Sequence, residues 1–194
     1  MTRVGWIMLA LVLLVVAGFA STVRFGGPSA TRFRMSRAAP AVEGVSPGML
    51  TIPVRGVRPS QIADSWGDAR GDGTREHHGT DIMAAAGTPV LAVMPGRVEK
   101  LFASRLGGTT LYLRSADRRW IYYYAHLSGY APGVSEGQVV RAGEPLGYVG
   151  DTGNAGAGNY HLHFGVQRML PTQHWWEGQD VNPYPLLAGR AAQR

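Results

Sequence analysis

Two histidines separated by a single residue, His161 and His163, lie near the end of the chain. In an extended strand, side chains at i and i+2 share a face, so both imidazoles point to one side. Leu162 and Phe164 then pack on the other side. Imidazole binds zinc and also titrates near neutral pH. The two rings therefore either bind one metal ion together or divide metal binding and proton transfer between them, unless the strand merely tolerates two histidines on its solvated face.

A second group of metal-binding side chains occurs earlier, where His77 and His78 precede Asp81. Gly79 and Thr80 disfavour a helix here and favour a turn that enters a strand. Imidazole and carboxylate are zinc ligands, and three protein ligands plus water form an open catalytic site. A solvated, hydrogen-bonded turn is the alternative interpretation of the same residues.

A third histidine, His126, ends a strand rich in tyrosine. By alternation, Tyr122 and Tyr124 share a face, and His126 is expected to continue that face. Taken alone, this pattern is typical of a partly buried structural histidine.

The elements that must position these residues are short β-strands joined by turns. Glycine or proline stands at nearly every junction, and long helical periodicity is absent between residues 52 and 187, so we expect an all-β domain there. The expected strands are Thr88–Val93, Arg97–Phe102, Thr109–Arg114, Trp120–Ala125, Gln138–Arg141, Pro145–Val149 and His161–Gln167.

Two of these strands have similar beginnings, Gly-Thr-Pro at 87–89 and Gly-Glu-Pro at 143–145, which indicates an internal duplication. The pattern also occurs in biotinyl and lipoyl carrier domains, which need a lysine at an exposed hairpin tip. Lys100 lies inside an expected strand, and this argues against a carrier.

Composition limits the kind of partner that the chain can bind and the ligands that a metal site can use. The chain carries a net charge of +6, and Lys100 is its only lysine. A basic surface suits an anionic partner, but no lysine-rich or aromatic-interleaved stripe indicates nucleic acid. Cysteine is absent, so a zinc site has only histidine and carboxylate ligands available.

The first 23 residues predict a membrane anchor. Residues 4–23 are uncharged and, as a helix, would span about 30 Å of hydrocarbon. A cleavable signal peptide is the alternative. Residues 24–51 predict an extended linker and residues 188–194 a flexible tail. This organisation predicts a folded domain that is membrane-anchored or, after cleavage, secreted, while the arginines on both sides of the segment give no clean orientation.

Together the three histidine motifs resemble lysostaphin-type, LytM-like zinc metallopeptidases. The matching segments are His77-x-x-x-Asp81, Tyr124-Ala-His126-Leu-Ser and His161-Leu-His163-Phe, in the order and approximate spacing of that family. Glycine-rich stretches at 106–109 and 149–155 and the closing segment 181–187 are also similar. The resemblance covers roughly residues 53–187.

The resemblance implies the identity of the site. The family's zinc ligands fall on His77, Asp81 and His163, and its two non-ligand catalytic histidines fall on His126 and His161. It also implies a duplicated hybrid motif, a small antiparallel β-sheet domain. The implied substrate is peptide bonds of bacterial peptidoglycan, in stem peptides or cross-bridges, with cell-wall or division proteins as further partners that the sequence does not identify.

Three features depart from this pattern or lie outside it. His78 stands between two motif residues, but adjacent side chains on an extended segment point oppositely, which leaves His77 as the expected ligand. Tyr160 occupies a place where the family usually has proline. His174, Trp175 and Trp176 form either a substrate wall or a local aromatic cluster.

A non-catalytic module that binds cell wall or regulates a hydrolase is the alternative function, although all five motif positions carry competent residues.

Overall fold

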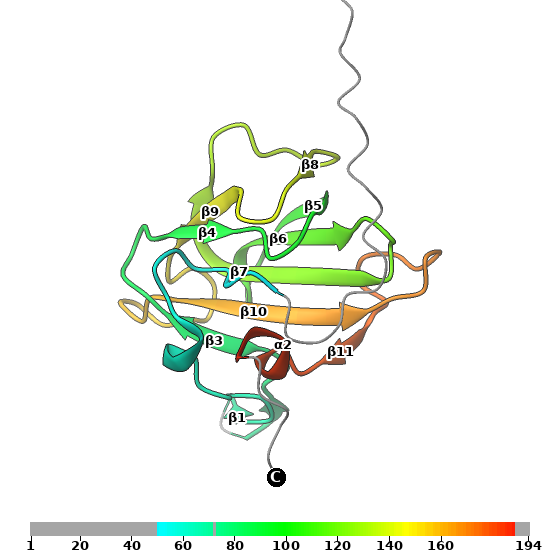
Figure 1. The fold of residues 1–194 in the computed structure, drawn as a ribbon. Helices are drawn as coiled ribbons and strands as arrows, with labels where there is room; N and C mark the ends of the chain where they lie inside the picture. Colours follow the sequence, from blue (N-terminus) through cyan, green and yellow to red (C-terminus); the bar gives the residue numbers. More distant parts are fainter. Residues whose placement is uncertain (1–49, 72, 189–194) are drawn as a thin grey trace, which may run out of the picture. The chain divides into compact units, whose positions relative to one another are not determined.

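The computed structural model describes residues 50–71 and 73–188. Strands dominate it, as expected for an all-β domain, and Figure 1 shows them as a stack of long arrows. The elements in chain order are the 3₁₀-helix η1 (Pro59–Gln61), β1 (Ala69–Arg70), β2 (Arg75–Glu76), β3 (Thr80–Met83), β4 (Pro89–Leu91), β5 (Gly96–Ser104), β6 (Gly108–Ser115), β7 (Trp120–Tyr130), β8 (Val139–Val140), β9 (Pro145–Val149), β10 (His161–Arg168), β11 (Gln179–Val181) and the short helix α2 (Tyr184–Ala188).

The main sheet is antiparallel and positions the motif residues. Its strands follow the order β11-β10-β7-β6-β5-β8, and β3 pairs with the part of β10 that holds the two histidines. In the β3–β10 register, Asp81 lies directly opposite His163 and Met83 lies opposite His161. On the other side of β10, Ala125 of β7 is also opposite His163. Residues far apart in the sequence are thus brought together by strand pairing.

One face of this sheet forms the hydrophobic core. Leu162 and Phe164 of β10 are fully buried there, as strand alternation predicts. The rings of Tyr124 and Phe164 pack 5.3 Å apart, and the Tyr124 hydroxyl accepts a hydrogen bond from the backbone N–H of Val93. The opposite face of β10 is left for His161 and His163.

The predicted direction of His126 is wrong. Tyr122 and Tyr124 point into the core, whereas His126 points to the opposite face, where Tyr123 also lies. The cause is a β-bulge, because two residues of β7 between Tyr124 and Leu127 oppose one residue of β6. His126 has a φ of 60°, which is rare for a residue other than glycine. The bulge therefore reverses the alternation just where the histidine is placed.

The strands that follow the two similar segments at 87–89 and 143–145 lie side by side. These strands, β4 and β9, pair antiparallel. The Gly87 N–H donates to the Val149 carbonyl and the Gly143 N–H donates to the Ala92 carbonyl, each at 2.8 Å. Both glycines have a φ close to 80°, which other residues rarely adopt. The glycine that precedes each strand thus donates to a carbonyl at the end of the other strand.

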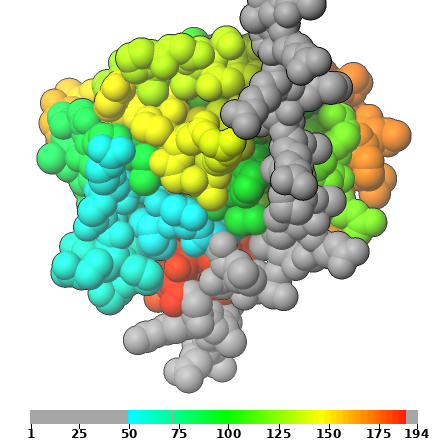
Figure 2. Space-filling model, turned by 45° about the horizontal axis from the view of Figure 1, so that its top comes forward, coloured from blue at the N-terminus to red at the C-terminus, as the bar shows by residue number. Residues whose placement is uncertain are grey.

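Residues 50–55 pack onto this pair of strands. Leu50 and Val54 are buried in the core, and Val54 forms a β-bridge with Val90. Figure 2 shows this segment in cyan, next to the yellow residues around β9 and the red C-terminal helix. It covers one edge of the core.

No helix among residues 50–71 and 73–188 is long and apolar enough to span a membrane. The predicted anchor at 1–23, nearly all of the linker at 24–51 and most of the tail at 188–194 lie outside the described residues.

Candidate metal centre and active site

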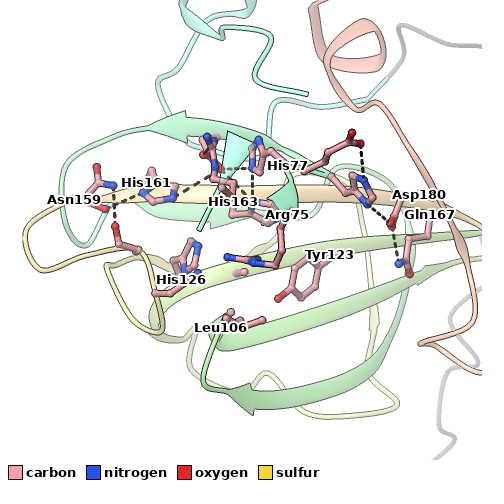
Figure 3. Close-up of a pocket in the computed structure, with 18 of the residues that line it drawn as sticks. Arg75, His77, Leu106, Tyr123, His126, Asn159, His161, His163, Gln167 and Asp180 are labelled. Atoms are coloured by element: carbon pink, nitrogen blue, oxygen red, sulfur yellow. Dashed lines mark hydrogen bonds and ion pairs between the residues drawn. The ribbon is translucent and has the colours of Figure 1, made fainter. Parts of the chain in front are cut away.

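The five motif residues line one cleft of about 700 Å³ on the face of the sheet opposite the core. His77 follows β2, Asp81 lies on β3, and His161 and His163 lie on β10. His126 reaches the cleft from β7 through the bulge described above. In Figure 3 the four histidines converge on one region, with the Tyr123 ring beside them.

Three of these residues bring atoms that can bind a metal ion close to one another. His77 Nε2 lies 3.0 Å from Asp81 Oδ1 and 2.9 Å from His163 Nδ1, and His163 Nδ1 lies 3.1 Å from the same carboxylate oxygen. Tetrahedral zinc with ligands at 2.0–2.1 Å would hold such atoms about 3.3 Å apart. The triangle is thus close to the size that a zinc ion requires.

A hydrogen bond beside the triangle shows which nitrogen of His77 carries the proton. His77 Nδ1 contacts the Ser65 carbonyl at 2.6 Å. A carbonyl only accepts, so Nδ1 carries the proton and neutral His77 directs an unprotonated Nε2 at Asp81 Oδ1. Two acceptors facing each other at 3.0 Å need a cation between them or a proton shared by them. The donor set and its polarity therefore fit a metal ion such as zinc.

Asp81 is held by its other oxygen. Arg70 donates from Nη2 to Asp81 Oδ2 at 2.8 Å, which leaves Oδ1 for the triangle. Burial by itself raises the pKa of Asp81, but the hydrogen bonds and charge that His163 and His77 supply when protonated outweigh it and hold that pKa well below its usual range. Burial also lowers the pKa of His163. Both groups thus favour the deprotonated forms that bind metal.

His126 and His161 lie beside the triangle with the same proton arrangement. His126 Nδ1–H donates to the Thr152 carbonyl and His161 Nδ1–H donates to the Asn159 carbonyl, each at 2.8 Å. Their rings lie 4.9 Å apart. In the neutral form of each ring, the Nε2 lone pair is therefore the one that is available. Burial lowers the pKa of His126 to about 4, which keeps this ring neutral at physiological pH.

A glycine makes room for the His163 ring. A Cβ at position 79 would lie 2.5 Å from His163 Cε1, so any other residue at Gly79 would displace the ring. The glycine between His78 and Thr80, which indicated a turn in the sequence, thus has a packing role at the site.

The structure separates the remaining predicted residues from the triangle. His78 is half exposed and turns away, with Nδ1 3.0 Å from Asp180. Tyr160 lies at the surface, 38% exposed. His174 and Trp176 stack on each other in the β10–β11 loop, outside the lining of the cleft.

Several residues of the cleft had no signal in the sequence. Arg70, which holds Asp81, and Arg75, which lines the cleft in Figure 3, come from a stretch that was not expected to contribute. The carbonyls of Ser65, Thr152 and Asn159 orient three histidines, and a sequence does not show where a carbonyl points. Tyr123 was noticeable only as the middle member of a tyrosine run.

Comparison with known proteins supports the motif-based resemblance. Residues 75–183 match the model of "Peptidase family M23". The chain is 39% identical over 129 residues to an L-Ala-D-Glu endopeptidase of Bacillus subtilis, with 63% of this chain and 38% of the relative covered. It is 37% identical over 114 residues to lysostaphin of Staphylococcus simulans, with 58% and 22% covered.

Solved structures give the same result. The catalytic domain of lysostaphin from Staphylococcus simulans superposes with a TM-score of 0.53 at 30% identity, covering 65% of this chain and 90% of that domain. The structure of LytU superposes with a TM-score of 0.53 at 29% identity, covering 64% and 83%. The chain spans less than two fifths of the length of the two sequence relatives named above.

Proposed function

The chain belongs to peptidase family M23, and on that premise we propose that it is a zinc-dependent endopeptidase that hydrolyses peptide bonds in bacterial peptidoglycan. The observation that carries the proposal is the triangle of His77 Nε2, Asp81 Oδ1 and His163 Nδ1, closed to within 3.1 Å. The relatives named as an L-Ala-D-Glu endopeptidase and as lysostaphin support peptidoglycan as the substrate.

The triangle would hold the zinc ion, and two further histidines would move protons. When bound, zinc supplies Lewis-acid chemistry, which polarises a carbonyl oxygen and makes water acidic enough to attack near neutral pH. His126 and His161 each present Nε2 beside the triangle, because Nδ1 of each ring donates to a backbone carbonyl. Such a nitrogen accepts a proton from the attacking water and, once protonated, donates one to the departing amine.

The buried tautomers prepare this proton transfer. Because the Nδ1–H of each ring is fixed on a backbone carbonyl, the free nitrogen already faces the cleft before substrate arrives. Preorganised groups need little rearrangement in the transition state. A binding module without catalysis would have no use for two such rings beside three metal-binding groups, so we place the alternative of a non-catalytic regulator second.

The proposal extends to architecture and location. The reciprocal contacts of β4 and β9 support a duplicated hybrid motif as the origin of the domain. The apolar residues 4–23 support an anchor that places the domain on the outer side of the membrane, where peptidoglycan lies. Further cell-wall or division partners are part of the same proposal, and no nucleic acid is.

The test is digestion of purified peptidoglycan by the zinc-loaded chain. We expect new amino groups to appear, with mass spectrometry of the fragments showing which bond is broken. The matched variants His161→Ala and His126→Ala should each slow the release of amino groups by at least 100-fold. Peptidoglycan that stays intact with the zinc-loaded chain, while a known endopeptidase digests it, would overturn the proposal.

A further inference from the structure

A row of aromatic rings leads away from the metal centre across the sheet. The Tyr123 ring of β7 lies 5.8 Å from that of His163 and 4.7 Å from Tyr112 on the neighbouring strand β6. Tyr112 in turn lies 4.5 Å from Trp175, which comes from the loop between β10 and β11. Tyr112 and Tyr123 also line the cleft. The row is therefore continuous with the cleft and extends beyond it.

At its outer end the row becomes an exposed surface. Trp175 packs 5.6 Å from Phe102 of β5 and 5.1 Å from Trp176. Phe102 is 42% exposed and Trp176 is 59% exposed. We call the outer part of this row the aromatic ledge, made of Phe102, Tyr112, Trp175 and Trp176. Four large rings that gather at the surface beside a cleft, and not in the core, indicate an interaction site.

The loop that carries the two tryptophans is fixed to the sheet by buried charge. Arg114 of β6 is only 1% exposed and pairs with Glu99 at 3.1 Å. It also donates to the Gln173 carbonyl at 3.1 Å, and Arg118 Nε donates to the Pro171 carbonyl at 3.0 Å. Burying this guanidinium has a desolvation cost, which its contacts with the loop offset. Because these contacts lie within the chain, the ledge is held in place before any ligand binds.

Polar groups lie at the margin of the ledge. His174 stacks on Trp176 at 4.6 Å with the ring planes 3° apart, and its backbone N–H donates to the Glu177 carboxylate at 2.7 Å. Both His174 and Glu177 are exposed. A surface of flat rings with hydrogen-bonding groups at its edge suits a ligand that has apolar faces and polar edges.

We propose that the aromatic ledge binds a sugar ring of the glycan strand while the attached peptide lies in the metal cleft, an inference that rests on the proposed function. Peptidoglycan consists of sugar chains cross-linked by short peptides whose side chains are mostly small or charged. Those peptides offer no large apolar group to an exposed tryptophan. A pyranose ring offers a face of C–H groups to the ring and hydroxyls to the margin. The ledge would thereby direct the enzyme to peptides still attached to glycan.

Binding can be measured without catalysis, because a ligand free of peptide contains no bond for the enzyme to cleave. The probes are chitotetraose and glycan strands stripped of peptide, titrated into the zinc-loaded full chain by isothermal calorimetry. The test variant is Trp176→Ala. The matched control is Leu170→Ala, which removes another apolar side chain of the same loop that is 64% exposed.

We expect the wild type and Leu170→Ala to bind the stripped strands alike, and Trp176→Ala to bind at least 10-fold more weakly. Equal melting temperatures would show that both variants are folded. Failure of the wild type to bind glycan, or equal binding by Trp176→Ala, would overturn the inference. So would a ledge that instead binds free stem peptide, or that joins two copies of the chain in sedimentation. Glycan binding without peptidoglycan digestion would overturn the proposed function alone.

Discussion

His77 and His78 are adjacent in the sequence but have opposite surroundings. His77 is 4% exposed, and its Nε2 belongs to the triangle. The His78 side chain is 50% exposed, stacks on Trp66 and contacts Asp180. Neighbouring side chains of an extended segment point to opposite sides, so the chain offers a proposed ligand and a natural control at consecutive positions.

Removal of His77 should therefore remove the metal, whereas removal of His78 should not. We expect about one equivalent of zinc per chain in the wild type and in His78→Ala. His77→Ala should fall to background, because a site with two ligands lacks the affinity of one with three. Elemental analysis after dialysis measures the content. Zinc retained in both variants would contradict the assignment of the triangle.

His126 should titrate far below an ordinary histidine. Its pKa is lowered from 6.5 to about 4, chiefly because burial penalises the charged ring. The unfolded chain takes up this proton near pH 6.5, so between pH 6.5 and 4 protonation favours unfolding, and this contribution to stability is lost as the pH falls. NMR titration of the ring, assigned by comparison with His126→Ala, should give a midpoint near 4. A midpoint near 6.5 would show that the ring is solvated.

The family resemblance of the three histidine motifs indicated which side chains would belong to one site, but not how His126 reaches the cleft. Alternation placed this residue on the face of Tyr124, and the bulge places it on the other. A positive φ at a residue other than glycine is imposed by its surroundings and leaves no trace in composition. Arg70 was missed for a similar reason, since a short polar strand gives no hint of the carboxylate it will meet.

At the scale of elements, the loop between β9 and β10 holds His126 in position through the Thr152 carbonyl. Gly153 in this loop has a φ of 72°, and a Cβ there would lie 2.3 Å from Gly108 N and from Leu106 O. Gly158 in the same loop has a φ of 78°, but a Cβ there would meet nothing within 4 Å. A side chain at Gly158 would therefore meet only an unfavourable backbone conformation, whereas a side chain at Gly153 would also collide with backbone atoms.

Gly158→Ala should lower the free energy of unfolding by about 1 kcal/mol, the cost of the strained backbone alone. Gly153→Ala should lower it by about 3 kcal/mol or more, since backbone atoms must also move. Denaturant unfolding of the two variants measures the difference. Equal losses would mean that the loop adapts freely and does not fix the Thr152 carbonyl.

All seven strands expected from glycine-bounded apolar runs are present as β4 to β10. The short polar strands β1, β2 and β11 were not anticipated. Polar strands of two or three residues offer neither an apolar run nor a periodicity to detect. β1 and β2 pair with each other across a short turn, whereas β11 depends on a partner from another part of the chain. For β11 that partner is β10, in the register Val166 to Val181. Local pattern thus predicted the apolar strands, short ones included, but not the short polar strands, which are defined only by their pairing.

At the scale of the whole molecule, the metal centre would join distant parts of the chain. His77 and Asp81 lie at the start of the domain, and His163 lies 82 residues after Asp81. A metal bound only by the folded arrangement stabilises it by mass action, by about 4 kcal/mol when its concentration is a thousand times its Kd. The ion would thus contribute to the fold as well as to the chemistry.

Chelation should therefore lower the melting temperature by roughly 10 °C, given about 2–4 °C per kcal/mol for a chain of this size. Added zinc should restore it. Differential scanning calorimetry with and without chelator is the measurement, and His163→Ala should melt at one temperature in both conditions. A chelator shift that persists in His163→Ala would place the bound ion elsewhere.

The carbonyls that orient His77, His126 and His161 have an evolutionary consequence. Every amino acid has a carbonyl, so no point substitution at positions 65, 152 or 159 deletes the acceptor that fixes a tautomer. Only a change in the path of the backbone can do so. The tautomers of the three histidines are thus insensitive to which side chains stand at these three positions, as long as residues such as Gly153 keep the path of the backbone.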